Sequence, residues 1–87
     1  MARYEVVLRR AVLKDLERIP KKYAKQILAT IKSLTENPRP PQCLKLSTDE
    51  KYRLRSGNYR ILYSIEDEKL IVCVVKVGHR KDVYRGL

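Results

Sequence analysis

The sequence of 87 residues contains no tryptophan and no phenylalanine, so six tyrosines supply all of its aromatic surface. It has no apolar run long enough to span a bilayer, and residues 1–10 lack the apolar segment of a signal peptide. The lack of both apolar segments predicts neither a transmembrane helix nor a secretory signal. We therefore expect a cytoplasmic protein that does not contact a membrane.

Cysteine and histidine are also scarce. Cys43 and Cys73 lie far apart in the sequence, and His79 is the only histidine, whereas a structural zinc site takes four closely spaced ligands. Cys73 lies within an apolar segment, where a free thiol packs as a small hydrophobic side chain. We expect both thiols to be reduced, and we expect neither a metal nor another cofactor.

Acidic side chains are few relative to basic ones. The chain has 20 Lys and Arg against 10 Asp and Glu, which gives a formal net charge of +10. Such an excess in a small domain favours a polyanionic partner such as nucleic acid. An acidic protein partner fits the same charge, and a basic surface that only keeps the protein soluble is the plain alternative.

The first half of the chain predicts a strand and two helices within one domain, residues 1–87. Alternation of apolar and polar residues predicts a half-buried strand at residues 3–8. Apolar positions at three- and four-residue spacing predict a helix over residues 10–19. Pro20, which a first turn tolerates, predicts the start of a second helix that reaches about Asn37. Helices joined so closely form a hairpin.

The second half predicts strands joined by short turns. The proline-rich residues 37–42 form a loop, and a short strand follows at residues 44–46. Alternating segments at residues 51–55 and 59–66 flank a Ser-Gly-Asn turn at residues 56–58, which has the composition of a hairpin.

The last predicted strand is a nearly continuous apolar run at residues 70–77. Such a run suits the middle of a sheet, and we expect Gly78 to end the strand. The order of elements predicts an α+β fold, with the helix hairpin packed on one face of a small antiparallel sheet of about four strands. The helical crossover leaves open which edge the first strand joins.

Basic side chains gather on the predicted sheet. The apolar residues of segment 51–55 share one face, which places Arg53 and Arg55 on the other, and Arg60 across the hairpin points the same way. Arg80 follows the apolar strand. Like charges at this density repel unless an anion lies among them, so the cluster indicates a phosphate site, with scattered surface arginines as the alternative. The basic residues that we add to this RNA- or ribosome-binding surface are Lys45, Lys51, Lys76, Lys81 and Arg85.

Two side chains near the arginines are natural proton carriers, His79 and Tyr84. Cleavage of RNA requires a base for the 2′-hydroxyl, cations for the phosphate oxygens and an acid for the leaving 5′-oxygen. Arginine suits the second task, while phenols among cations and imidazoles suit the proton transfers. A structural histidine and a tyrosine that only packs are the ordinary alternatives.

Residues 45–85 carry the block YRLRxGxYRxxYxIxDxxxxVxVxxVGHRxxVYR, which resembles the RelE side of the RelE/ParE superfamily of toxins from toxin–antitoxin pairs. The preceding strand and helix hairpin extend the resemblance over nearly the whole chain. It implies a RelE-like microbial RNase fold and an endoribonuclease without a metal that cleaves messenger RNA in the ribosomal A site. It also implies attack by the 2′-hydroxyl on the adjacent phosphodiester and inhibition of translation.

The resemblance implies roles for individual residues. Arg60 matches the phosphate-contacting arginine of the family, and Arg80 matches the arginine assigned to transition-state charge. Tyr84 matches the tyrosine proposed to handle a proton or to stack on a base. Arg53 and Arg55 occupy the strand where the family prototype carries two lysines.

Two further features separate this chain from the prototype. His79 stands where the prototype has lysine, so we prefer it as general base or acid, and Arg53, Arg55 and Tyr84 remain alternatives. The chain also stops three residues after Tyr84, whereas the prototype continues into a terminal helix.

The resemblance also implies partners. We expect a protein that is a monomer when free, binds messenger RNA and the ribosome, and is held inactive by an acidic, amphipathic cognate antitoxin. Two other functions fit the same sequence. One is a ParE-like inhibitor of DNA gyrase, and the other is a non-catalytic basic module that only binds nucleic acid.

Overall fold

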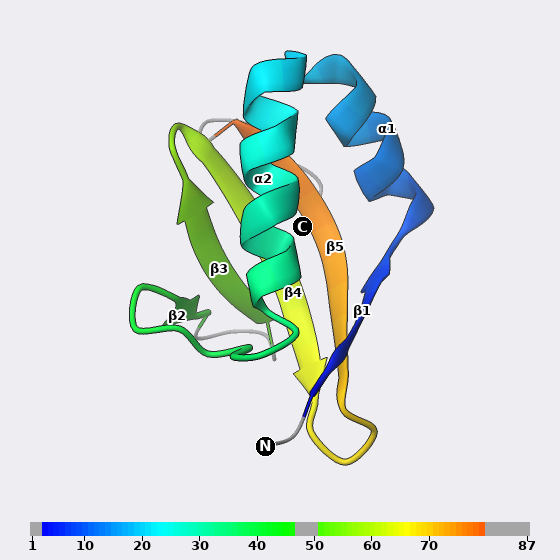
Figure 1. The fold of residues 1–87 in the computed structure, drawn as a ribbon, viewed down its shortest axis with the longest axis vertical. Coiled ribbons are helices and arrows are strands. Elements are labelled where there is room, and N and C mark those ends of the chain that lie inside the picture. Colours follow the sequence, from blue (N-terminus) through cyan, green and yellow to red (C-terminus); the bar gives the residue numbers. More distant parts are fainter. Residues whose placement is uncertain (1–2, 47–50, 80–87) are drawn as a thin grey trace.

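The computed structural model describes residues 3–46 and 51–79, which form a five-stranded sheet with two helices on one face (Figure 1). The strands are β1 (Glu5–Leu8), β2 (Leu44–Lys45), β3 (Lys51–Ser56), β4 (Tyr59–Glu66) and β5 (Ile71–His79). The helices are α1 (Arg10–Arg18) and α2 (Lys21–Ser33). This arrangement confirms the predicted α+β class.

The sheet has the strand order β1-β5-β4-β3-β2. Strands β3, β4 and β5 form the predicted antiparallel meander, and β5 lies inside the sheet as its apolar sequence indicated. However, the sheet has five strands and is mixed, because β1 pairs with β5 in parallel, from Glu5 opposite Ile71 to Leu8 opposite Val74. The prediction of about four antiparallel strands was wrong in this respect, since local periodicity does not specify a partner at the other end of the chain.

The helix hairpin begins and ends close to the predicted positions. Pro20 directly precedes α2, where the lack of a backbone N–H costs nothing. Helix α2 ends at Ser33 rather than near Asn37. After Ser33 the backbone passes into turns with i→i−3 hydrogen bonds, from the Leu34 N–H to the Ile31 carbonyl and from the Thr35 N–H to the Lys32 carbonyl, and the Thr35 hydroxyl also donates to the Lys32 carbonyl at 2.8 Å.

Strand β5 passes through Gly78 instead of ending there. The pairing with β4 continues beyond the glycine, because Gly78 lies opposite Arg60 and His79 lies opposite Tyr59. Glycine weakens a strand, but a fixed partner strand maintains the ladder here. The structure therefore corrects the predicted end of this strand.

A bulge also interrupts the ladder between β4 and β5. Leu62 pairs with Lys76 and Tyr63 pairs with Val74, which leaves Val75 as an extra residue in β5. A bulge resets the alternation of side chains, so Val74 and Val77 both face the helices while Val75 faces the other side.

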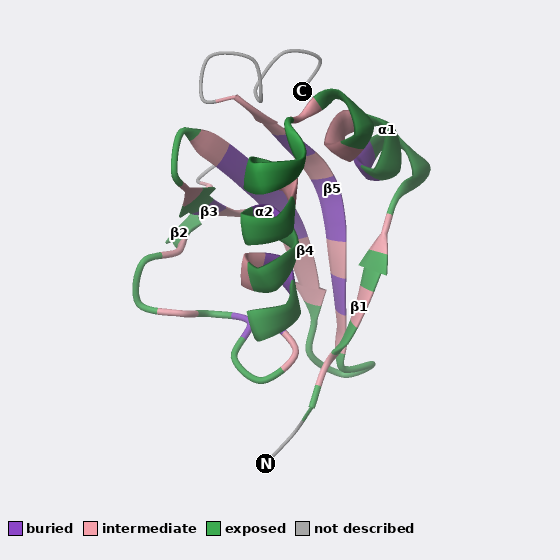
Figure 2. Cartoon of the chain, turned by 45° about the horizontal axis from the view of Figure 1, so that its top comes forward, coloured by how far each residue is buried: buried purple, intermediate pink, exposed green. Residues whose placement is uncertain are grey.

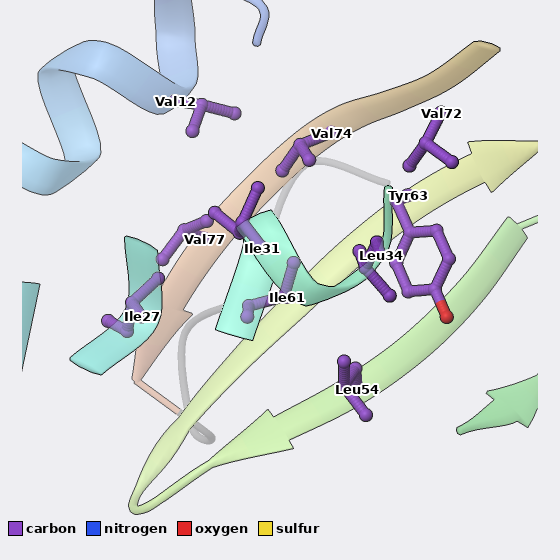
Figure 3. Packing of buried hydrophobic residues seen from close by; sticks show 10 residues of the cluster. All are labelled: Val12, Ile27, Ile31, Leu34, Leu54, Ile61, Tyr63, Val72, Val74 and Val77. Atoms are coloured by element: carbon purple, nitrogen blue, oxygen red, sulfur yellow. The ribbon is translucent and has the colours of Figure 1, made fainter. Parts of the chain in front are cut away.

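The main core lies between the sheet and the helices (Figures 2 and 3). The helices contribute Val12 from α1 and Ile27, Ile31 and Leu34 from α2 and its C-terminal end. Each buried side chain of this size contributes roughly 1.5–3 kcal/mol through the hydrophobic effect. The sheet residues of this core are Leu54, Ile61, Tyr63, Val72, Val74 and Val77.

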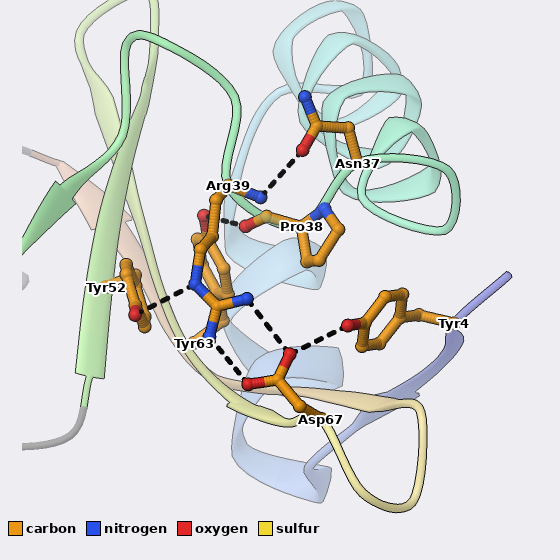
Figure 4. A network of polar contacts seen from close by, with 7 residues as sticks. All are labelled: Tyr4, Asn37, Pro38, Arg39, Tyr52, Tyr63 and Asp67. Carbon is orange, nitrogen blue, oxygen red and sulfur yellow. Dashed lines mark hydrogen bonds and ion pairs between the residues drawn. The ribbon is translucent and has the colours of Figure 1, made fainter. Parts of the chain in front are cut away.

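A polar network pins the proline-rich loop to the sheet (Figure 4). Both Nη atoms of Arg39 donate to the Asp67 carboxylate, at 3.0 and 2.8 Å, and its Nε donates to the Tyr52 hydroxyl at 3.1 Å. The Tyr4 hydroxyl donates to Asp67 at 2.7 Å. The Tyr63 hydroxyl donates to the carbonyl of Pro38 at 2.8 Å. The network therefore ties the loop to β3, to β4, to the turn before β5 and to the segment before β1.

This network predicts a specific sensitivity to acid. Hydrogen bonds from Arg39 and Tyr4 lower the pKa of Asp67 from 3.8 to about 2. A carboxylate with a lowered pKa stabilises the fold above about pH 4, and this contribution is lost as the pH falls towards 2. We expect the parent to lose melting temperature over that range more steeply than Asp67→Asn, measured by circular dichroism. The effect is modest and weakens with salt, because both charged partners are about half exposed.

The matched control is Glu68→Gln, an exposed acid in the same turn. Its melting temperature should follow that of the parent across the same pH range. Equal acid sensitivity in Asp67→Asn and Glu68→Gln would show that the network contributes nothing.

Candidate nucleic-acid interface

The face of the sheet that the helices leave open carries three arginines, Arg53 and Arg55 of β3 and Arg60 of β4. Leu54 and Ile61 belong to the main core on the helix-covered face. Because side chains alternate along a strand, Arg53 and Arg55 beside Leu54, and Arg60 beside Ile61, point to the other face. The register sets Arg55 directly across from Arg60. The structure thus brings together three of the arginines that the sequence singled out, and we call them the arginine cluster.

Arg60 differs from its neighbours in burial. It is only 8% exposed, and it is the one charged residue classed as buried among the described residues, whereas Arg55 is exposed. A guanidinium stays protonated even when buried, and its field is stronger where water is excluded. Like charges directly across a strand pair repel each other, and an anion between them removes that repulsion. The Arg55–Arg60 pair is therefore suited to phosphate oxygens.

Apolar and amide side chains extend this face towards the sheet edge. Leu62 and Val75 are buried there in a small second cluster, and Leu62 is the cross-strand neighbour of Arg53. Leu44 of β2, which is 53% exposed, pairs with Arg53 on its other side. A shallow hollow of about 220 Å³ opens beside the cluster. Its lining residues are Gln42, Leu44, Arg53 and Arg55.

His79 lies on the other side of the sheet from the arginine cluster. It is paired with Tyr59, and the two rings meet edge to face at 5.9 Å. The ring centroid of Tyr59 in turn lies 5.8 Å from that of Tyr23 in α2, on the helix-covered side of the sheet. The role of His79 as base or acid stays a prediction. It borders a second hollow of about 460 Å³, whose other lining residues include Asp15, Arg18, Ile19, Tyr59 and Lys76.

The described lysines that were assigned to RNA binding do not share one face of the sheet. Lys51 shares the face of the arginine cluster and pairs with Ser64. Lys45 pairs with Tyr52, which packs against the main core, so Lys45 belongs to the helix-covered side. Lys76 forms an ion pair with Asp15 at 3.6 Å. The predicted site residues that lie outside the described residues are Arg80, Lys81, Tyr84 and Arg85.

Sequence reasoning missed Asp15. This acid stands three residues after Val12 and four before Ile19, so it lies on the apolar stripe of α1. A charged acid on the inward face of a helix needs a partner, so its position on the apolar stripe could have indicated that Asp15 makes a partly buried polar contact. The contacts of Arg39 with Asp67 had no such signal, because they join two irregular segments that are distant in sequence.

Other kinds of site find little support in residues 3–46 and 51–79. No group of three or more His, Cys, Asp and Glu side chains in that part of the chain could hold a metal ion. None of its helices is long and apolar enough to cross a membrane. Cys43 and Cys73 are both free thiols.

The chain is similar to several known proteins. A family model described as the ParE toxin of the type II toxin–antitoxin system parDE matches residues 6–84. A RelE-like protein of Escherichia coli is 34% identical over 86 residues, which cover 94% of this chain and 90% of that protein. The mRNA interferase toxin RelE of Escherichia coli K12 is 30% identical over 77 residues, which cover 79% and 75%. A chain in the crystal structure of the archaeal RelE–RelB complex from Pyrococcus horikoshii superposes with a TM-score of 0.81 at 27% identity, covering 95% of this chain and 100% of that one.

Proposed function

We propose that this chain, which belongs to the RelE/ParE family of toxins from type II toxin–antitoxin systems, is an endoribonuclease that cleaves messenger RNA in the ribosomal A site. One relative carries the name mRNA interferase toxin. The observation that carries the proposal is the arginine cluster, because three guanidiniums on one open sheet face suit the phosphates of a nucleic-acid strand.

In the proposed reaction, the 2′-oxygen of the substrate attacks the adjacent phosphorus. A bond forms between that oxygen and phosphorus, and the bond from phosphorus to the 5′-oxygen of the next nucleotide breaks. Arg60 and Arg55 stabilise the charge that develops on the non-bridging oxygens. Arg53 holds a neighbouring phosphate, and Arg80 adds a further positive charge at the scissile group. The products are a 2′,3′-cyclic phosphate and a free 5′-hydroxyl.

We assign proton transfer first to Tyr84, and His79 is the alternative carrier. A base removes the proton of the 2′-hydroxyl, and an acid supplies one to the leaving 5′-oxygen. Because His79 lies on the helix-covered side with Tyr59, Tyr84 is the carrier to test first at the arginine cluster. Arginine serves these steps poorly because it does not lose its proton near neutral pH.

The chain is the toxin of a toxin–antitoxin pair, and we propose an acidic, amphipathic antitoxin as its partner. The net charge of +10 favours an acidic chain. The helices also expose apolar side chains that an amphipathic segment would cover, with Leu13 at 50%, Leu28 at 43% and Tyr23 at 41% exposure. Binding to the folded toxin stabilises it by mass action.

The direct test combines purified protein with translating ribosomes that carry a defined message, followed by mapping of the new 5′-ends. We expect cuts at the codon in the A site and none in the same message without ribosomes. Tyr84→Phe should lose cleavage, whereas His79→Ala should keep most of it, because His79 lies across the sheet from the arginine cluster. An intact message on translating ribosomes would rule out the proposed activity.

The match to the ParE model supports a second candidate, inhibition of DNA gyrase through protein contact. Such an inhibitor needs no proton carrier, so Tyr84→Phe would remain toxic on expression. Gyrase-dependent DNA breaks in expressing cells, together with intact messenger RNA, would favour this function over RNA cleavage.

A further inference from the structure

Strand β5 extends beyond the strand that pairs with it along one edge. The pairing with β1 ends where Leu8 lies opposite Val74, and the N–H of Arg9 donates to the Val74 carbonyl at 3.2 Å. Past that point, no described strand pairs with this edge of β5, although β5 continues to His79. Backbone groups on an unpaired edge need another partner or water.

The side chain of Asp15 from α1 takes the place of the missing strand. Its Oδ2 accepts a hydrogen bond from the backbone N–H of Val77 at 3.3 Å, and its Oδ1 lies 3.6 Å from the Nζ of Lys76. The Asp15 side chain is 16% exposed and that of Lys76 is 32% exposed. A carboxylate at this depth is stable only when it is hydrogen-bonded and paired, and both contacts fall on adjacent residues of β5.

The opposite edge of the same stretch is fixed by β4. Gly78 pairs with Arg60 of the arginine cluster, and His79 pairs with Tyr59. The last residues of β5 are therefore held from both edges, by a strand on one side and by Asp15 on the other. Val77, whose N–H donates to Asp15, lies opposite Ile61, the residue next to Arg60.

We propose that Asp15 is a positioning residue for RNA cleavage, which holds the end of β5 against β4 and so fixes the backbone from which Arg60 of the arginine cluster projects. This inference rests on the proposed function. Asp15 itself lies on the helix-covered side and does not touch the substrate. Catalysis depends steeply on placement, since a displacement of about 1 Å costs on the order of 10²-fold in rate.

A purely structural role for Asp15 would have a different signature. Loss of a contact between α1 and β5 would lower the melting temperature and reduce activity only through the unfolded fraction. A positioning role instead lowers the rate of the chemical step in fully folded protein and leaves ribosome binding unchanged.

The test uses two substitutions of nearly equal shape. Asp15→Asn keeps an oxygen that accepts from Val77, whereas Asp15→Leu keeps the packing and removes the acceptor. Glu17→Leu, at an exposed acid on the same helix, is the matched control. Asp15→Ala provides a second variant without an acceptor should the leucine variant fail to fold.

Two measurements separate the hydrogen bond between Asp15 and the Val77 N–H, which we call the anchor, from its effect on catalysis. We expect amide hydrogen exchange at Val77 to rise at least about tenfold in Asp15→Leu and little in Asp15→Asn. The single-turnover cleavage rate on saturating ribosomes should fall by about 10- to 100-fold in Asp15→Leu, below the unfolding transition, with ribosome affinity unchanged. Asp15→Asn should recover most of that rate, and Glu17→Leu should match the parent.

Parent-like exchange at Val77 in Asp15→Leu would overturn the anchor itself. Faster exchange with a parent-like cleavage rate would overturn the positioning role. If the parent protein does not cleave ribosome-bound message, the proposed function fails and the catalytic role of Asp15 fails with it, while exchange at Val77 still reports on the anchor separately.

Discussion

Replacement of Arg60 by alanine is expected to slow cleavage of ribosome-bound messenger RNA by about 10²-fold or more. Arg60 is 8% exposed and lies directly across from Arg55. A fixed guanidinium in a partly dehydrated position stabilises developing negative charge without having to reorganise. The measurement is the single-turnover rate on saturating ribosomes, taken together with a thermal melt.

Two further variants separate charge, shape and stability at this position. Arg60→Lys keeps the charge but loses the planar fork, so it should recover only part of the rate. Arg60→Met keeps an apolar stem of similar size and should be as slow as alanine while melting closer to the parent. Arg10→Ala, at an exposed arginine of α1, serves as the control and should cleave at the parent rate. Equal rates in Arg60→Ala and Arg10→Ala would remove the arginine cluster from the mechanism.

Replacement of Tyr63 by alanine is expected to lower the free energy of unfolding by about 3–5 kcal/mol. The side chain is fully buried, its ring stacks on Tyr52 at a centroid distance of 5.7 Å, and its hydroxyl donates to Pro38. Burial raises the pKa of this phenol well above its usual value, so the hydroxyl stays protonated and remains a donor. The free energy of unfolding of a small domain is only about 5–15 kcal/mol in total, so the variant should be close to unfolding.

Urea denaturation of three variants would check this expectation. Tyr63→Phe keeps the ring and loses one hydrogen bond, which should cost about 1 kcal/mol. Tyr23→Ala removes a tyrosine that is 41% exposed and should cost clearly less than Tyr63→Ala. A loss in Tyr63→Ala no larger than that in Tyr23→Ala would contradict the assigned core.

The main core and the arginine cluster lie on opposite faces of the same two strands, β3 and β4. Tyr52 stacks on Tyr63 and accepts a hydrogen bond from Arg39, and the next residue of β3 is Arg53 on the opposite face. Packing on the helix side therefore fixes the backbone from which the arginine projects. A strand held in this way positions a charged side chain better than a loop does.

Several features were readable from the sequence because they depend on neighbouring residues. The alternation in residues 51–55 and 59–66 set the parity of Arg53, Arg55 and Arg60, and the Ser-Gly-Asn turn joined the two strands. A two-residue period specifies a face without knowledge of the partner strand.

Other features were beyond sequence reasoning. The bulge at Val75, the continuation of β5 through Gly78 and the parallel pairing of β1 each depend on a strand from another part of the chain. His79 was expected beside the arginines, and its pairing with Tyr59 places it across the sheet from them.

The sequence by itself determined the α+β class, the helix hairpin, the family and the common face of three arginines, because each follows from local periodicity, charge or motif. Only the tertiary structure decided the edge joined by β1, the side on which His79 lies and the contact of Asp15 with the end of β5. Those outcomes depend on pairing and packing between residues distant in the chain, which the periodicity of a single segment does not specify.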